Sequence, residues 1–111
     1  MAEADSKFKI VFSNGNEVPL TESRNFGRSD FEGRVEDELK LQYVSRDQIR
    51  IYLENGHIQI EELETSKNGT WLISGGNVTK LEKGKKYDVK EGDEVNFSMS
   101  VTIKVEKDIA A

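Results

Sequence analysis

The 111-residue sequence contains no cysteine, one histidine, one proline and no long apolar run. The absence of cysteine excludes disulfides and thiolate metal ligands. A zinc or copper site would have to rely on carboxylates, and their spacing shows no ligand pattern. No segment approaches the length of a membrane span, and the first residues lack the apolar region of a signal peptide. We therefore expect a soluble, cytoplasmic protein with no metal, no cofactor and no membrane partner.

The patterns of common catalytic sites are also missing. The only histidine, His57, directly follows an Asn-Gly turn signal, whereas a catalytic triad would need it near Ser45. The intervening segment is predicted to be a strand that leads away from Ser45 at about 3.3 Å per residue, which separates the two side chains. No glycine-rich loop of the Rossmann or P-loop type is present. We do not expect an enzyme.

A basic excess is lacking as well. The net charge is −5, with 16 Lys and Arg against 21 Asp and Glu, so any anion site must be local. Domains whose main partner is duplex nucleic acid usually have a basic excess on one face. As an alternative, one basic segment could bind an RNA backbone. It has few interleaved aromatics, however, and is better explained as the solvated end of a strand. Its residues are Lys80, Lys83, Lys85, Lys86 and Tyr87. We expect no nucleic-acid partner.

Short segments in which every second residue is apolar dominate the chain. Asn-Gly dipeptides favour the positive φ angles of type I′ turns, and they occur at 14–15, 55–56 and 68–69. The first two are flanked by alternating segments and predict hairpins. From 95 to 105 every odd position is apolar, which predicts strand pairing with one face inward, interrupted by a turn near Ser98–Ser100.

The sequence predicts one all-β domain. The best helix candidate, Arg34–Leu41, is short and lacks a clear cap. Hydrophobic residues make up 35% and charged residues 33%, which allows a single lean core. Many short strands with one proline indicate an antiparallel β-sandwich. We expect the domain to span residues 7–107, with a flexible segment at 1–6 and a frayed end at 108–111.

A local anion site is suggested where a predicted loop gives way to a strand. Ser45 and Arg46 lie side by side there, and a hydroxyl beside a guanidinium suits a tetrahedral oxyanion. Arg28 can supply a second guanidinium and Lys67 a third positive charge. Taken singly, each arginine is better explained as a loop residue paired with a nearby aspartate. The phosphate hypothesis requires the fold to bring these loops together.

Three short motifs, Gly27-Arg28, Val44-Ser45-Arg46 and Asn68-Gly69-Thr70, match in order and approximate spacing the signature of forkhead-associated (FHA) domains. The sequence resembles this family over residues 7–107, including the turn at 91–95 that family members often carry before a closing strand. The resemblance implies an FHA/SMAD-like sandwich of about eleven short strands with binding loops at one end. It also implies recognition of phosphothreonine peptides through arginine contacts.

The resemblance further implies roles for individual residues. Arg28 and Ser45 would contact the phosphate directly. Arg46 would add charge at the rim or contact the phosphate as well, and Asn68 would hydrogen-bond the peptide backbone. One loop would lie where the residue three places after the phosphothreonine is selected, and it consists of Ser74, Gly75, Gly76 and Asn77.

Four further positions would support or modify this site. Gly27 would support Arg28, and Gly69 would allow the sharp turn that presents the binding asparagine. Gln48 stands where the family usually has a histidine that braces the loops, and glutamine can donate and accept hydrogen bonds in its place. Lys67 stands where the family usually has threonine or serine, and it either strengthens phosphate binding or faces solvent.

We therefore expect a phosphothreonine-dependent protein-binding module of Ser/Thr-kinase signalling, as part of a larger regulatory protein. Its partners would be a phosphothreonine-containing protein or peptide and an upstream Ser/Thr kinase. The alternative is a phosphate-independent interaction or dimerisation domain on the same scaffold, through an exposed strand edge.

Overall fold

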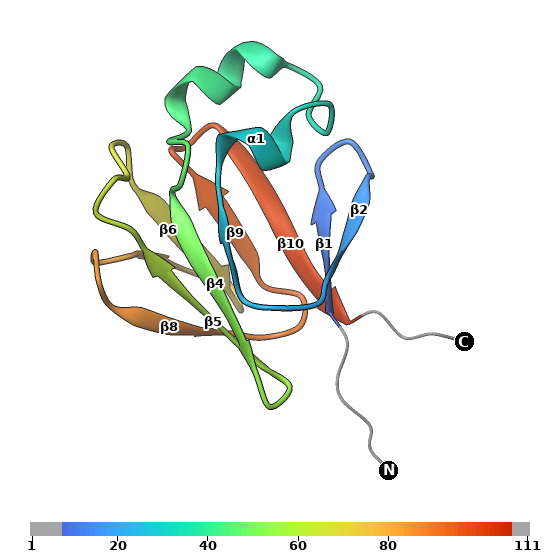
Figure 1. Cartoon of the computed structure of the whole chain (residues 1–111), viewed down its shortest axis with the longest axis vertical. Coiled ribbons are helices and arrows are strands. Elements are labelled where there is room, and N and C mark those ends of the chain that lie inside the picture. Colours follow the sequence, from blue (N-terminus) through green and yellow to red (C-terminus); the bar gives the residue numbers. More distant parts are fainter. Residues whose placement is uncertain (1–7, 108–111) are drawn as a thin grey trace.

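The computed structural model describes residues 8–107, which form two antiparallel sheets packed as a sandwich (Figure 1). The strand order is β2-β1-β10-β9-β6-β7 in one sheet and β3-β4-β5-β8 in the other. The all-β sandwich predicted from the sequence is thus confirmed, with ten strands in the described range. The flexible segment expected at 1–6 and the frayed end expected at 108–111 lie outside the described residues.

The elements follow one another closely along the chain. Ten strands and two short helices occupy residues 8–107, namely β1 (Phe8–Phe12), β2 (Glu17–Leu20), β3 (Arg24–Phe26), α1 (Arg28–Phe31), the 3₁₀-helix η1 (Glu38–Tyr43), β4 (Ile49–Glu54), β5 (His57–Glu62), β6 (Thr70–Ser74), β7 (Asn77–Lys80), β8 (Lys86–Val89), β9 (Glu94–Phe97) and β10 (Val101–Lys107).

The turn chemistry of the sequence explains the hairpins. Asn55 and Gly56 both have positive φ, 53° and 76°, and they connect β4 to β5 as predicted. Asn14-Gly15 also lies in a hairpin, between β1 and β2, where only Gly15 has positive φ. The turn between β1 and β2 is therefore a longer loop, in which the Gly15 N–H donates to the Phe12 carbonyl at 2.9 Å.

The alternating C-terminal segment is divided as expected. Ser98 and Met99 have φ of 59° and 56° and turn the chain from β9 into β10. Five of the six odd-numbered apolar residues between 95 and 105 are buried. Met99 differs, because it lies in the turn itself and is 77% exposed.

Four phenylalanines join the two sheets beneath the helices. Phe26 belongs to the four-stranded sheet, Phe12 and Phe97 to the six-stranded sheet, and Phe31 to α1. Phe31 contacts the other three rings, with centroids 5.0 to 5.5 Å apart. The residue that begins α1, Arg28, is therefore carried on an element anchored to both sheets.

The helical content differs from the prediction for Arg34–Leu41. The chain instead forms one turn of α-helix at α1 and a 3₁₀-helix at η1. At the start of η1 the Leu39 N–H donates a hydrogen bond to the Asp37 side chain. Each helix buries a single residue, Phe31 or Leu41, so neither leaves an apolar repeat of helical period in the sequence. Both lie at one end of the sandwich, opposite the β4–β5 turn (Figure 1). No helix within residues 8–107 is long and apolar enough to span a bilayer.

Candidate functional site

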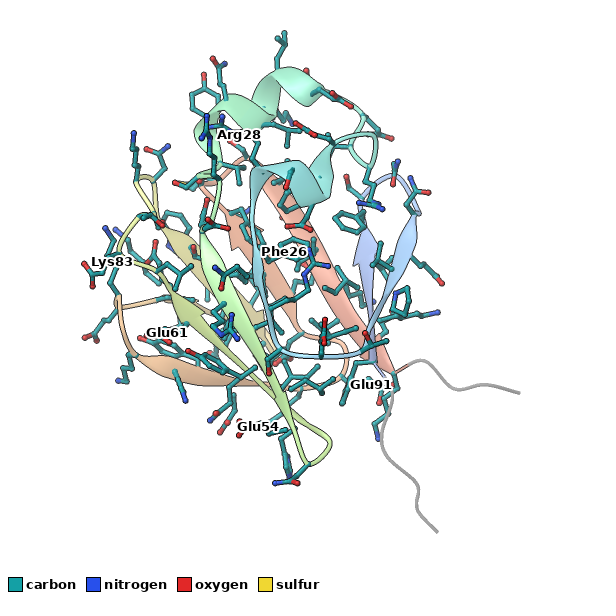
Figure 2. All side chains as sticks on the ribbon, viewed as in Figure 1. Phe26, Arg28, Glu54, Glu61, Lys83 and Glu91 are labelled. Carbon is teal, nitrogen blue, oxygen red and sulfur yellow. The ribbon has the colours of Figure 1, made fainter. Side chains whose placement is uncertain are left out.

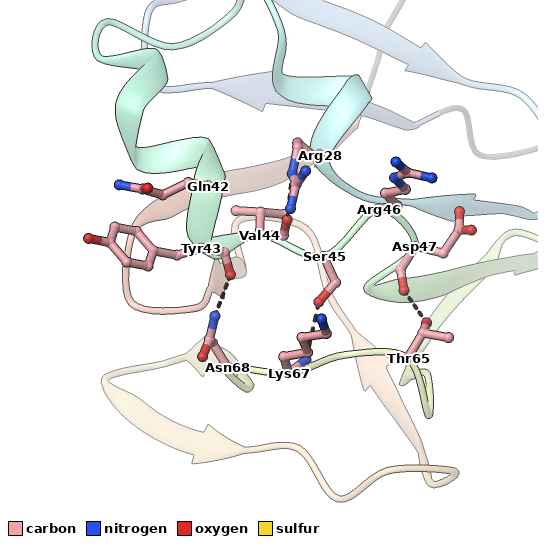
Figure 3. A pocket seen from close by; sticks show the side chains of 10 residues that line it. All are labelled: Arg28, Gln42, Tyr43, Val44, Ser45, Arg46, Asp47, Thr65, Lys67 and Asn68. Carbon is pink, nitrogen blue, oxygen red and sulfur yellow. Dashed lines mark hydrogen bonds between the residues drawn. The ribbon is translucent and has the colours of Figure 1, made fainter.

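A pocket of about 520 Å³ opens at the end of the sandwich where the two helices lie (Figure 3). Its walls come from the start of α1, the end of η1, the loop before β4 and the loop before β6. The lining residues are Arg28, Gln42, Tyr43, Val44, Ser45, Arg46, Asp47, Thr65, Lys67 and Asn68. Five of the residues predicted from the sequence are among them.

Arg28 is oriented by the turn that precedes it. The Gly27 N–H donates to the Asp30 carboxylate at 2.9 Å, and the same carboxylate is paired with Arg24. The Arg28 backbone N–H donates to the Ser45 carbonyl at 3.0 Å, and its Nε donates to the Val44 carbonyl at 2.8 Å. Among residues 8–107, the terminal guanidinium nitrogens of Arg28 have no hydrogen-bond partner. Figure 2 shows Arg28 at this end of the molecule.

Gly27 is required by a close approach of two chain segments. A Cβ atom at this position would lie 1.9 Å from the Arg46 carbonyl oxygen and 2.7 Å from that of Ser45. Only glycine lets the end of β3 contact the Ser45–Arg46 backbone at this distance. The contact holds Arg28 beside Ser45.

Ser45 has a hydroxyl group whose hydrogen is available. Its Oγ accepts a hydrogen bond from the Lys67 backbone N–H at 3.1 Å, which links the loop before β4 to the loop before β6. No acceptor among the described residues takes the hydroxyl hydrogen. Figure 3 shows Arg28 and Lys67 on either side of Ser45. The hydroxyl can therefore donate to a ligand that both cations also reach.

Gln48 braces the loops around the pocket from below. Its fully buried amide uses all four of its hydrogen-bonding positions. Nε2 donates to the Gly69 carbonyl at 2.8 Å and to Thr70 Oγ1 at 2.9 Å. Oε1 accepts from the Ser45 N–H at 3.1 Å and from Ser98 Oγ at 3.2 Å. One glutamine thus connects the loop before β4, the loop before β6 and the β9–β10 turn.

The charge at the pocket is positive although the chain is acidic. Its lining carries three cationic side chains, those of Arg28, Arg46 and Lys67, and one carboxylate, that of Asp47. The ion pairs that would make the arginines ordinary loop residues are not found within residues 8–107, because Asp30 pairs with Arg24 and no Arg46–Asp47 ion pair forms. An anion is the ligand that this lining favours.

The amide of Asn68 is held at the pocket rim. Its Nδ2 donates to the Tyr43 carbonyl at 2.8 Å, while the residue as a whole is exposed. This hydrogen bond leaves Oδ1 as an exposed acceptor. Gly69 follows with φ of +89°, a conformation that favours glycine.

Sequence reasoning missed Gln42, Tyr43 and Thr65. The first two end η1 directly before Val44, and Thr65 Oγ1 donates to the Asp47 carbonyl at 2.6 Å. Their adjacency to the motifs was the only sequence signal. Residues next to a binding motif share its loop and therefore its pocket.

The loop of residues 74–77 is not brought to this pocket. It connects β6 to β7, and β6 runs from Thr70 beside the pocket to Ser74 at its far end. The Ser74 hydroxyl donates to Asp93 Oδ1 at 2.8 Å, in the turn between β8 and β9. Neither Gly75, Gly76 nor Asn77 lines the pocket.

His57 lies at the other end of β4 from Ser45. The histidine begins β5 after the Asn55-Gly56 turn, and the whole of β4 separates it from Ser45. Within residues 8–107 no group of three or more potential ligands could hold a metal ion.

Comparisons with known proteins agree with this fold. An FHA domain family model matches residues 24–98, and no curated protein matches the sequence. The FHA domain of human APLF, solved with an XRCC1 bisphospho peptide, is 18% identical with a TM-score of 0.72, covering 90% of this chain and 97% of that one. The FHA domain of an Arabidopsis thaliana hypothetical protein is 20% identical with a TM-score of 0.73, covering 96% and 90%.

A third solved structure is the N-terminal FHA domain of S. cerevisiae Rad53p in complex with a phosphothreonine peptide. It is 18% identical with a TM-score of 0.65, covering 92% of this chain and 94% of that one. At these identities the solved structures show the shared fold. The family match itself spans about two thirds of the sequence, and the chain therefore belongs to the FHA domain family.

Proposed function

We propose that this domain is a phosphothreonine-dependent protein-binding module that recognises the products of Ser/Thr kinases. The observation that carries the proposal is the convergence of Arg28, Ser45 and Lys67, from three separate segments, on one pocket without a paired carboxylate. The human APLF and S. cerevisiae Rad53p domains, which share the fold, were solved with phosphorylated peptides. The function would be served within a larger cytoplasmic regulatory protein, without catalysis.

The phosphate chemistry follows from the donors present. A phosphothreonine carries nearly two negative charges and three acceptor oxygens. The free guanidinium nitrogens of Arg28 and the Ser45 hydroxyl would donate to them, and Lys67 and Arg46 would add positive charge. Hydrogen bonds to charged groups contribute about 1.5–3 kcal/mol each. Two or three of them contribute about 3–9 kcal/mol before desolvation, and together with contacts to the peptide backbone they support micromolar affinity, which corresponds to about −8 kcal/mol.

Peptide recognition would use the rim of the same pocket. Oδ1 of Asn68 would accept from a peptide backbone N–H, since Nδ2 is already held by Tyr43. Gly27, Gln48 and Gly69 would support the loops. Burying the extra methyl group of phosphothreonine contributes about 0.8 kcal/mol, so we expect at least about fourfold preference over phosphoserine.

The basic residues that offered a nucleic-acid site are engaged within the domain. Lys80 lies over the ring of Trp71 at 5.5 Å from its centroid, and Lys86 lies over Tyr52 at 4.2 Å. Lys85 covers Tyr87 at 5.5 Å. Because these lysines cover the domain's own aromatic faces, stacking platforms for bases are not left open there. This supports a protein partner and no nucleic acid.

Calorimetric titration with a degenerate phosphothreonine peptide library tests the proposal. We expect micromolar binding to phosphothreonine peptides, weaker binding to phosphoserine peptides, and none to unphosphorylated ones. Arg28→Ala should abolish binding, and Arg28→Lys should weaken it because lysine lacks the Nε donor that bonds Val44. Arg50→Ala removes the same charge from the outer face of β4 and is the matched control. Equal binding by Arg28→Ala and wild type would refute the site.

A second candidate function is phosphate-independent protein interaction or dimerisation. An apolar groove of about 250 Å³ lies beside the edge strand β7, lined by Trp71, Ile73, Val78, Asn96 and Met99. Val78 is 63% exposed and Met99 77%. Sedimentation of wild type and Val78→Asp across a range of concentrations tests it. Self-association lost in Val78→Asp would favour this function.

A further inference from the structure

Most of the buried polar side chains form one network beneath the pocket. Glu62, the last residue of β5, is 2% exposed. Its Oε2 accepts a hydrogen bond from Ser66 Oγ at 2.5 Å and another from Thr70 Oγ1 at 3.5 Å. Ser66 and Thr70 are themselves buried, and they bracket Lys67, Asn68 and Gly69 in the sequence. One carboxylate oxygen therefore holds both ends of the Ser66–Thr70 loop.

The network continues to the phosphate side of the pocket by two routes. Thr70 Oγ1 accepts from Gln48, whose Oε1 in turn accepts from the Ser45 N–H. From the other end, Ser66 directly precedes Lys67, whose N–H donates to Ser45 Oγ. Both routes start at Glu62 and end at Ser45.

Stability and charge do not explain a carboxylate at this position. Within residues 8–107 Glu62 belongs to no ion pair. Burying a carboxyl group without a cation is unfavourable. A negative charge beneath an anion pocket would also oppose anion binding. What the carboxylate does provide is an acceptor common to both ends of one loop.

We propose that Glu62 is a positioning residue of this site, which tethers the Ser66–Thr70 loop so that Lys67 and Asn68 are ordered before the ligand binds. The proposal rests on the phosphopeptide-binding function proposed above. A loop ordered in advance loses less conformational entropy on binding, and the affinity is higher for that reason. Glu62 acts through Ser66 and Thr70 and does not line the pocket.

Glu62→Met and Glu62→Gln separate the acceptor from the charge. Methionine removes the acceptor at similar size, whereas glutamine keeps an acceptor oxygen and removes only the charge. In Glu62→Met we expect lower backbone ¹⁵N order parameters at Lys67 and Asn68 in the free protein, approaching the flexible range below about 0.6. We expect affinity for a phosphothreonine peptide to fall about tenfold, because the untethered loop must then be ordered when the peptide binds. Glu62→Gln should restore most of the order and the affinity.

The direction of the affinity change distinguishes this role from a purely electrostatic one. If Glu62 acted only by its charge, both variants would bind the peptide more tightly than wild type. Glu64→Met, at an exposed position on the same segment, makes the same charge change and should leave loop order unaltered. Ser66→Ala removes one end of the tether and should show the same effects more weakly, which covers a failure of Glu62→Met to fold.

Three results would overturn the proposal: unchanged order at Lys67 and Asn68 in Glu62→Met, equal losses in Glu62→Gln, or affinity losses that only follow a fall in Tm. If the wild-type domain binds no phosphothreonine peptide, the proposed function fails, and the order parameters of the free variants still decide whether Glu62 tethers the loop.

Discussion

A methyl group on Gly27 would have no room in this structure. It would lie 1.9 Å from the Arg46 carbonyl oxygen and 2.5 Å from the carbonyl carbon. Non-bonded heavy atoms need about 3.5 Å, so the end of β3 and the Ser45–Arg46 backbone must separate by more than about 1 Å. No side-chain rotation relieves the overlap, since the three nearest atoms all belong to the backbone. Gly27→Ala therefore perturbs the spacing of Arg28 and Ser45 directly.

The size of the effect follows from the bonds that this displacement breaks. Two hydrogen bonds cross this contact and are lost, from the Arg28 N–H to the Ser45 carbonyl and from Arg28 Nε to the Val44 carbonyl. At about 0.5–1.5 kcal/mol each, with about 1–3 kcal/mol for overpacking, the free energy of unfolding should fall by about 2–6 kcal/mol. For a domain of this size Tm should fall by about 8–24 °C. Phosphopeptide binding should be lost, because the donors move beyond the tolerance of about 0.5 Å that such sites allow.

Thermal unfolding followed by circular dichroism, with peptide titration of the folded variant, measures both effects. Gly33→Ala is the matched control: its φ is +76° and nothing lies within 4 Å of the added methyl, so only backbone strain of about 1 kcal/mol is expected. If Gly27→Ala unfolds at the same temperature as Gly33→Ala and still binds the peptide, the close contact between β3 and the Ser45–Arg46 backbone does not exist.

Two further predictions concern other hydrogen bonds. Gln48→Ala leaves the Ser45 N–H and the Gly69 carbonyl without their partner, so urea denaturation should show a loss of about 2–4 kcal/mol, and an unchanged midpoint would contradict the bracing role. The hydrogen bond from Tyr52 to Glu61, followed by desolvation and the Glu61 charge, raises the pKa of Tyr52 above its ordinary value of about 10. The stabilisation from this bond is therefore complete below the ordinary tyrosine pKa and is lost as pH rises through the raised one. Absorbance titration of tyrosinate should show one tyrosine that ionises above the ordinary tyrosine pKa in the wild type. This ionisation should be absent from Tyr52→Phe, which assigns the signal. Glu61→Gln should return it toward about pH 10, and no change in that variant would contradict the assignment.

Much of the fold was predictable because its signals are local. Alternating apolar residues place β1, β4, β5, β9 and β10 with one face inward. Asn55-Gly56 and Ser98–Ser100 turn the chain where expected. The two helices were not predicted correctly, since each buries one residue and helix patterns become visible only over several turns.

The candidate site was predictable in part. Arg28, Ser45, Arg46, Lys67 and Asn68 line one pocket, as the resemblance to FHA domains implied. The loop of residues 74–77 was placed by its position in the sequence, but the direction of β6 carries it to the far end of the strand. The direction of β6 depends on its pairing with β9, which is distant in the sequence, and with β7, which follows the loop itself.

Local chemistry alone was therefore enough for the strand pattern and the turns, because each depends on neighbours within a few residues. Packing between distant segments decided the rest. Gly27 against the Ser45–Arg46 backbone, the four-way bonding of Gln48 and the tether at Glu62 each join residues from different loops. Such contacts exist only once the sheets have paired, and no local sequence pattern encodes the distances at which they form.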